Sequence, residues 1–174
     1  MMGCNCGLDD PDDVAELNAV ANDLGIDTIE VGATLSTLMD AGLGAFGDKA
    51  FMLAVLEDLR QGSERGKLLA QGTARVGEHY KVARVPAIKK QGISAYDPRV
   101  IEVTGISMML TAQGADHTTG HVPAYDCNGK TTGELVAVSL EAQTMTAAGD
   151  SLAFCHPGNR IAGASGYNSV HLGS

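Results

Sequence analysis

The sequence predicts an all-α fold, and three observations support this prediction. Over most of the 174 residues, apolar side chains recur at spacings of three and four, which is typical of one buried face of a helix. Aspartate or serine precedes several of these stretches and glycine follows them, as in capped helices. No pair of strand-like runs flanks a hairpin turn. We therefore expect short helices joined by tight turns.

The first predicted helix begins at Asp10-Pro11 and ends at Gly25. An aspartate cap followed by proline favours a helix start, and glycine readily adopts the left-handed conformation that ends a helix. Between them the apolar residues stand three, four and three positions apart: Val14, Leu17, Ala21 and Leu24. A second helix is predicted over 28–40, with Gly42 after it.

Three more helical pieces are predicted before residue 81. Asp48 opens a helix that Gly62 ends, and its inward positions are Phe51, Met52, Val55, Leu56 and Leu59. A short helix is expected within 63–72, and 73–80 has room for one or two turns.

The second half of the chain is less regular. Residues 81–96 predict a loop or a short extended segment, because proline, glycine and basic residues interrupt the helical pattern. Asp97-Pro98 repeats the cap-and-proline start, and the helix it opens carries Ile101, Ile106, Met109 and Leu110. Glycine and threonine fill 114–133, which is expected to be a loop, and a last helix is expected over 134–148.

We expect a single helical domain over 1–160, followed by a weakly ordered tail over 161–174. A chain of this length can bury one core. The tail is rich in glycine, serine and asparagine, which is typical of a poorly ordered terminus.

Charge and hydropathy limit the classes of function. The net charge is −9 and the sequence pI is near 4.8, which argues against binding to nucleic acid. No apolar run approaches the ~20 residues of a membrane-spanning helix, and the first residues lack the basic-then-apolar pattern of a signal peptide. We therefore expect a cytoplasmic protein with no nucleic-acid partner and no membrane partner.

The cysteines are interpreted as thiols or metal ligands, since disulfides are rare in the cytoplasm. Cys4 and Cys6 do not match a zinc knuckle, whose cysteines sit two to four residues apart. His117 and His121 are four residues apart, but the glycines, threonines and proline around them disfavour a helix. A zinc site made by these two histidines and Cys127 is therefore not expected.

Three short segments carry ligand-binding or proton-transferring groups: 22–27, 114–117 and 150–155. The first and third each begin with a polar side chain, have a small residue three positions later, and close on a possible ligand two positions after that. The small residue permits a tight turn at a helix end, so the polar groups can converge on one ligand. The alternative interpretation is structural, because Asp and Gly near helix ends are usually caps and a lone cysteine is usually a small apolar residue.

Together and in order, these segments resemble the tungsten-containing aldehyde ferredoxin oxidoreductases. That family binds a bis-pterin tungsten cofactor between two copies of Asp-x-x-Gly-Leu-(Asp/Cys). Residues 22–27 resemble the first copy, with Asn22 for the leading Asp and Ile26 for Leu. Residues 150–155 resemble the second copy, with Ala153 for Gly and Phe154 for Leu. Four further segments also look like family segments in the right order: 3–10, 27–32, 68–72 and 95–99.

The resemblance implies a fold, cofactors and site residues. The fold would be that of helical domains 2 and 3 of the family, and the cofactors would be tungstopterin (bis-molybdopterin) and a [4Fe–4S] cluster. His117 would be the catalytic residue, because 114–117 looks like the family segment whose histidine helps proton transfer. Cys155 would ligate iron. The cofactor-binding residues would be Asn22, Gly25, Asp27, Asp150 and Ala153.

This chain also departs from the family pattern. It lacks the family's N-terminal β domain, the upstream active-site Glu and the Cys-x-x-Cys-x-x-x-Cys segment that provides the other cluster ligands. Cys155 alone cannot hold a cubane cluster, which needs about four ligands. Some members bind iron at a dimer interface through Glu-x-x-His; Glu16 matches that Glu, but Ala19 replaces the His, so no such iron is expected.

Three hypotheses about function follow. In the first, the chain is a fragment or subunit of an oxidoreductase that oxidises aldehydes to carboxylic acids, inactive alone, with ferredoxin and the missing β domain and cluster-binding segment as partners. In the second, it is a free-standing, homo-oligomeric, non-catalytic binding module derived from that scaffold, with no cofactor. In the third, the motif similarity is accidental. The occurrence of these motifs in the right order favours the first two over the third.

Overall fold

The computed structural model describes residues 2–120, 122–123 and 125–153, and contacts group the chain into two compact units, Met1–Ala95 and Tyr96–Ser174. A single domain over 1–160 is predicted, whereas the buried apolar residues form two separate clusters, one in each unit. Each unit is therefore described by itself. The predicted tail over 161–174 lies outside the described residues.

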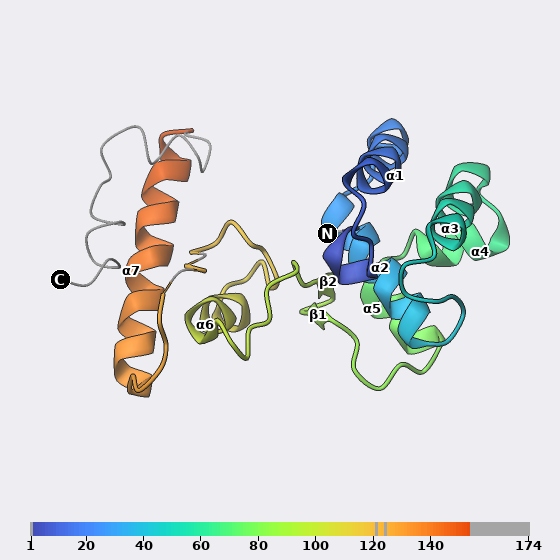
Figure 1. The fold of residues 1–174 in the computed structure, drawn as a ribbon. Helices are drawn as coiled ribbons and strands as arrows, with labels where there is room; N and C mark the ends of the chain where they lie inside the picture. The colour runs from blue at the N-terminus through green and yellow to red at the C-terminus, as the bar shows by residue number, and fades with distance from the viewer. Residues whose placement is uncertain (1, 121, 124, 154–174) are drawn as a thin grey trace. The chain divides into compact units, whose positions relative to one another are not determined.

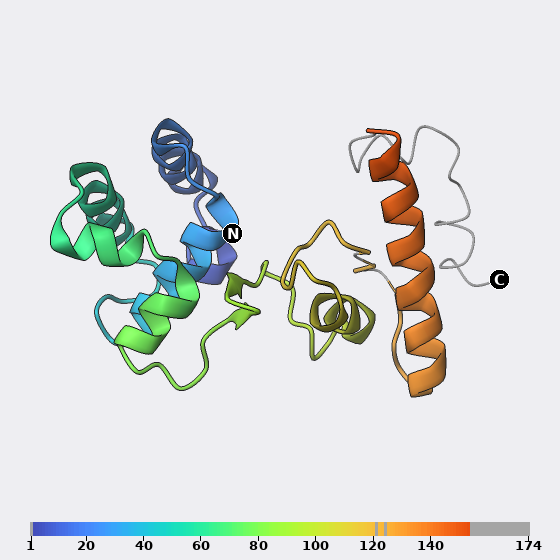
Figure 2. The ribbon, with the colours of Figure 1, turned by 180° about the vertical axis from the view of Figure 1, so that it is seen from behind.

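The first unit is a set of short helices with one small hairpin (Figures 1 and 2). Its elements, in chain order, are the 3-10 turn η1 (Cys4–Cys6), α1 (Pro11–Leu24), α2 (Thr28–Asp40), α3 (Lys49–Gln61), α4 (Glu64–Leu69), α5 (Thr73–His79), β1 (Ala87–Ile88) and β2 (Gln91–Gly92). The five α-helices of this unit fall within a few residues of the predicted ranges, and the predicted mostly helical fold is confirmed.

Side-chain caps and glycines set the bounds of these helices. The side chains of Asp10, Asp27 and Asp48 each accept a hydrogen bond from a backbone N–H of the first turn of α1, α2 and α3. Gly25 and Gly62 end α1 and α3 with φ of 68° and 60°, a conformation in which any other residue is strained. The cap and stop signals of the sequence therefore mark these ends correctly.

Helix α2 is the centre of the first unit. It contacts η1, α1, α5 and β2, and its residues 32–39 are all buried. Around it lies the core, whose largest fully buried side chains include Leu17, Leu35, Leu38, Met52 and Leu56. Burial of each such side chain contributes roughly 1.5–3 kcal/mol, so packing on α2 holds the unit together.

The hairpin of β1 and β2 is a feature that the sequence analysis did not predict. Ala87 pairs with Gly92 and Ile88 with Gln91 in antiparallel register. Lys89 and Lys90 form the turn with φ of 51° and 72°. A two-residue turn with both φ positive is usually made by Asn-Gly or Asp-Gly, so a Lys-Lys pair carries no hairpin signal.

The second unit consists mainly of α6 (Glu102–Leu110) and α7 (Thr132–Ser151), which contact each other. The predicted start of α6 at Asp97 is wrong, because the Asp97 carboxylate accepts from the N–H and guanidinium of Arg99 and the N-cap is Ile101. Helix α7 begins with a reciprocal capping box between Thr131 and Glu134. Within the described residues, no helix is long and apolar enough to cross a membrane.

Small residues bring α6 and the loop before α7 against α7. The buried hydroxyls of Ser107 and Ser139 lie 2.8 Å apart, and Gln143 donates to the Ser139 hydroxyl at 2.9 Å. A Cβ on Gly120 would lie 2.8–3.1 Å from atoms of Gln143. Glycine at this position therefore fixes how closely the loop before α7 approaches α7.

Candidate functional site

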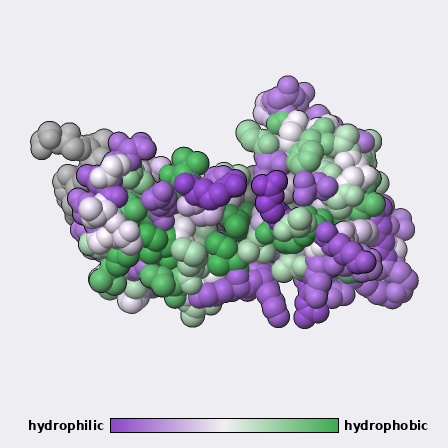
Figure 3. Space-filling view, turned by 90° about the horizontal axis from the view of Figure 1, so that it is seen from below, coloured by the Kyte–Doolittle hydropathy of each residue, from purple (hydrophilic) through white to green (hydrophobic). Residues whose placement is uncertain are grey.

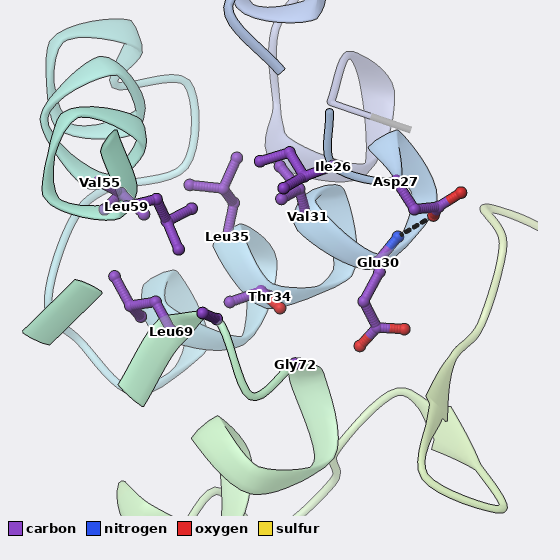
Figure 4. Close-up of a pocket in the computed structure, with 11 residues that line it drawn as sticks. Ile26, Asp27, Glu30, Val31, Thr34, Leu35, Val55, Leu59, Leu69 and Gly72 are labelled. Carbon is purple, nitrogen blue, oxygen red and sulfur yellow. Dashed lines mark hydrogen bonds between the residues drawn. The ribbon is translucent and has the colours of Figure 1, made fainter. Parts of the chain in front are cut away.

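The segment 22–27 forms the connection between α1 and α2. The backbone carbonyl of Asn22 accepts from the N–H of Gly25 at 3.0 Å, which closes the turn. Asp27 is exposed, and its Oδ1 accepts from the N–H of Glu30 at 2.7 Å, as drawn in Figure 4. The side chain of Asn22 is also exposed. The turn thus places two exposed polar side chains on either side of a left-handed glycine, as the sequence analysis expects.

Glu30 is a residue of this region that the sequence analysis missed. Its Oε1 accepts from the N–H of Thr73 and its Oε2 from the N–H of Gly92, each at 2.7 Å. The Thr73 hydroxyl also donates to the Glu30 backbone carbonyl at 3.1 Å. One carboxylate therefore joins the first turn of α2 to α5 and to the hairpin. Helical periodicity carries no signal for this role, since the partners lie 43 and 62 residues away.

Two glycines make room for the Glu30 carboxylate. A Cβ on Gly72, which has φ of +85°, would lie 2.8 Å from Oε1. A Cβ on Gly92 would lie 3.0 Å from Oε2 and 2.9 Å from the Cβ of Ala33. Glycine at these two positions therefore lets the backbone approach the Glu30 carboxylate closely. Glu30 lies in the first turn of α2, next to the Asp27 cap.

The second motif lies at the end of α7. Asp150 is exposed in the last turn, and its carbonyl accepts from the N–H of Ala153 at 2.9 Å. Ala153 has φ of 56°, so it takes the same left-handed conformation that Gly25 takes in the first motif. The two motifs therefore share a backbone turn, as their sequences indicate. Cys155 lies outside the described residues.

His117 lies in the loop between α6 and α7, and its side chain is 44% exposed. Its Nδ1 is 3.9 Å from Oδ1 of Asp116. Partial burial tends to raise the pKa of Asp116, but hydrogen bonds from the N–H and hydroxyl of Thr118 and the nearby His117 outweigh it, so this pKa is lowered. Asp116 is thus an ionised carboxylate beside the imidazole, held by Thr118 at 2.7–2.8 Å.

The predicted site residues divide between the two units. Asn22, Gly25 and Asp27 lie together on one turn of the first unit. Asp150 and Ala153 lie together on the second unit, which also carries His117. Their roles in binding a cofactor or moving a proton stay predictions.

Metal-binding groups are sparse in what the structure describes. Over 2–153, apart from residues 121 and 124, no three His, Cys, Asp or Glu side chains gather closely enough to hold a metal ion. Glu16 Oε2 and Asp13 Oδ1 each lie 2.6 Å from Nζ of Lys49, so Glu16 takes part in an ion pair. His121, one of the histidines weighed for zinc, lies outside the described residues.

Comparison with known proteins places this chain beside one family. A family model described as aldehyde ferredoxin oxidoreductase, domains 2 and 3, matches residues 1–168. The tungsten-containing aldehyde ferredoxin oxidoreductase of Pyrococcus furiosus is 29% identical over 136 residues, which are 70% of this chain and 22% of the relative. The protein of the same name from Thermococcus kodakarensis is 26% identical over 136 residues, with the same two shares.

The chain spans about a fifth of the length of the curated relatives it matches. The family model, by contrast, covers nearly all of the chain. Seven α-helices and one short hairpin in the described residues also agree with helical domains. The resemblance predicted from the sequence is therefore confirmed, and the chain belongs to the aldehyde ferredoxin oxidoreductase family.

Proposed function

We propose that this chain is the helical part of a tungsten-dependent oxidoreductase that converts aldehydes to carboxylic acids and passes the electrons to ferredoxin. The observation that carries the proposal is the match of residues 1–168 to domains 2 and 3 of the family. The relatives' names give the tungsten, the aldehyde and the ferredoxin. Because the chain spans only 22% of those relatives, we propose that it is inactive alone.

The first motif fits a pterin by the chemistry of its donors and acceptors. A pterin presents N–H groups, and an ionised carboxylate accepts strong hydrogen bonds from such groups. Asp27 is exposed and uses one oxygen to cap α2, and a carboxylate has about four acceptor positions in all. Asn22 adds a side chain that both donates and accepts. In this proposal these two side chains orient one pterin across the Gly25 turn.

The second motif has the same backbone form, and we assign it the other pterin. Asp150 is exposed at the end of α7 and can accept from N–H groups as Asp27 does. Ala153 takes the left-handed conformation that turns the chain there. When bound, tungstopterin supplies a metal that accepts the two electrons an aldehyde loses on becoming a carboxylic acid.

His117 is proposed to hold or move a proton during aldehyde oxidation. Its imidazole is partly exposed, so a substrate can reach it, and the ionised Asp116 stands beside it. An imidazole can both accept and donate a proton, which suits a group that moves one. The resemblance of 114–117 to the family segment with an active-site histidine supports this assignment.

The iron–sulfur cluster is assigned to residues beyond the described ones. A cubane cluster needs about four protein ligands, and no group of three candidate ligands gathers within the described residues. We propose that Cys155 supplies one ligand and another polypeptide segment supplies the rest.

Exposed apolar side chains support a partner polypeptide. Met109 and Leu110 at the end of α6 are 60% and 67% exposed, and Leu140 on α7 is 65% exposed. Figure 3 shows apolar surface over this unit, the half of the picture that carries the grey atoms. Large exposed apolar side chains of this kind commonly mark an interaction surface. We assign it to the remainder of the enzyme, and a homo-oligomer is the alternative.

Metal analysis of the purified protein tests this function. We expect tungsten and iron to copurify with the polypeptide or complex that contains this sequence, and an aldehyde to reduce a low-potential dye that stands in for ferredoxin. A complete, folded polypeptide or complex that contains this sequence but lacks tungsten, although its cells were supplied with it, would contradict the proposal. It would favour the non-catalytic binding module instead.

A further inference from the structure

A pocket of about 220 Å³ lies in the first unit beside the start of α2 (Figure 4). Its walls come from the turn before α2, from α2 and α3, and from the end of α4 with the segment that follows it. The apolar side chains that line it are Ile26, Val31, Leu35, Val55, Leu59, Leu69 and Ala70. Leu35, Val55 and Leu69 are buried, so these walls belong to the packed core rather than to a mobile surface.

The size and lining of this pocket suit a small apolar molecule. In another protein, a cavity of roughly 150 Å³ lined by aliphatic and aromatic side chains stays dry and binds benzene. The present pocket is larger and similarly apolar, but smaller than the roughly 300–1,000 Å³ that holds drug-sized ligands. One six-membered ring with a short substituent is therefore the size of ligand that it can enclose.

Carboxylates at one side of the pocket decide which charge it accepts. Asp27 and Glu30 both line it, and Figure 4 shows them on the side away from Val55, Leu59 and Leu69. No lysine, arginine or histidine is among the lining residues. An anion that enters the pocket would be repelled by these two carboxylates, because no cation balances them. An uncharged molecule would not be repelled, and an ammonium group would be attracted.

We propose that this pocket binds a small molecule that has one ring, or an alkyl chain of similar size, and no negative charge. This site goes beyond the proposed tungsten function, since its walls are apolar and its ligand needs no metal. It shares Asp27 with the first pterin motif, so a ligand in it would lie beside the cofactor-binding turn.

Three probes of one shape test the proposal: cyclohexylmethanol, cyclohexylmethylamine and cyclohexanecarboxylate. Each is titrated into the full chain without cofactor, and methyl signals are followed by NMR. We expect the alcohol and the amine to shift the methyl signals of Val55, Leu59 and Leu69 saturably. The methyls of Val103, buried in the core of the other unit, are the control and should stay in place. No saturable shift with millimolar alcohol or amine overturns the proposal.

The charge selection is tested with Asp27→Asn. Asparagine caps a helix about as well as aspartate, so α2 should keep its start while one negative charge is lost. The carboxylate probe should bind the wild-type chain at least about fivefold more weakly than the alcohol, the size of one contact between like charges at roughly 4 Å in water. In the variant, the affinity of the carboxylate probe should come closer to that of the alcohol. An unchanged ratio would refute selection by Asp27. Failure of this test leaves the tungsten function standing, because no metal enters the measurement.

Discussion

Glu30 has three hydrogen-bonded contacts with α5 and the hairpin, and its own N–H donates to Asp27. Replacing Glu30 by Gln gives an NH2 group that must face either the N–H of Thr73 or that of Gly92. Because two donors cannot pair, one buried backbone group loses its acceptor. We expect the free energy of unfolding to fall by about 1–3 kcal/mol in urea titrations.

Glu64→Gln is the matched control for this change. Glu64 makes an exposed ion pair with Lys67 within α4, and such pairs contribute little. If both substitutions changed stability equally, the account of Glu30 as a link between elements would be wrong.

Cys6 is a buried thiol whose chemistry should differ from that of exposed Cys4. Burial raises the pKa of Cys6 from 9.0 to about 11, so the thiol stays neutral in the folded state. Alkylation at pH 8, located by peptide fragmentation, should label Cys4 and leave Cys6 unlabelled in the native protein. Equal labelling of the two would contradict the burial of Cys6.

The same shift predicts how stability depends on pH. Since the unfolded thiol loses its proton near pH 9 and the folded one near 11, the contribution of Cys6 is complete below pH 9 and falls between pH 9 and 11. The loss should be about 1.4 kcal/mol per pH unit at most. This part of the pH dependence should be missing from Cys6→Ala, which is the control.

At the scale of elements, Gly120 and Gly129 separate backbone strain from packing. Both have positive φ, 74° and 70°, but a Cβ on Gly120 would meet Gln143 on α7, whereas a Cβ on Gly129 meets nothing within 4 Å. Gly129→Ala should cost about 1 kcal/mol from backbone strain alone. Gly120→Ala should cost roughly 2–4 kcal/mol, because the loop must also move away from α7. Equal losses in thermal or urea unfolding would show that the close approach at Gly120 contributes nothing.

Local chemistry explains which elements the sequence predicts well. Helices α1 to α3 have side-chain caps within three residues of the groups they bind, so their starts can be read locally. The hairpin and the start of α6 are different. The Lys89-Lys90 turn has an unusual composition, and the Asp97 carboxylate is taken by Arg99 rather than by a helix N–H. The residue types at the turn therefore do not indicate a hairpin, and the Asp97-Pro98 pair indicates a helix start where none forms.

For the whole molecule, the division into two units was not predictable from periodicity. Helical spacing shows which face of each helix is buried, but not which helices share a core. The cluster around Leu35 and Met52 and the cluster around Val103 and Leu135 are separate, although the sequence pattern is similar in both. For the candidate site, residue order predicted the family and the two turns, whereas Glu30 emerged only from contacts over 43 and 62 residues.

The central claim is that the turn around Asp27 binds a tungsten pterin, and paired variants of the complete, metal-loaded protein test it most directly. Asp27→Ala and Asp10→Ala both remove an exposed helix cap, from α2 and α1 respectively, so their effects on stability should be similar. The tungsten content per polypeptide is then measured by mass spectrometry. We predict that Asp27→Ala loses most of its tungsten while Asp10→Ala retains it. Equal retention of tungsten by the two folded variants would contradict the assignment.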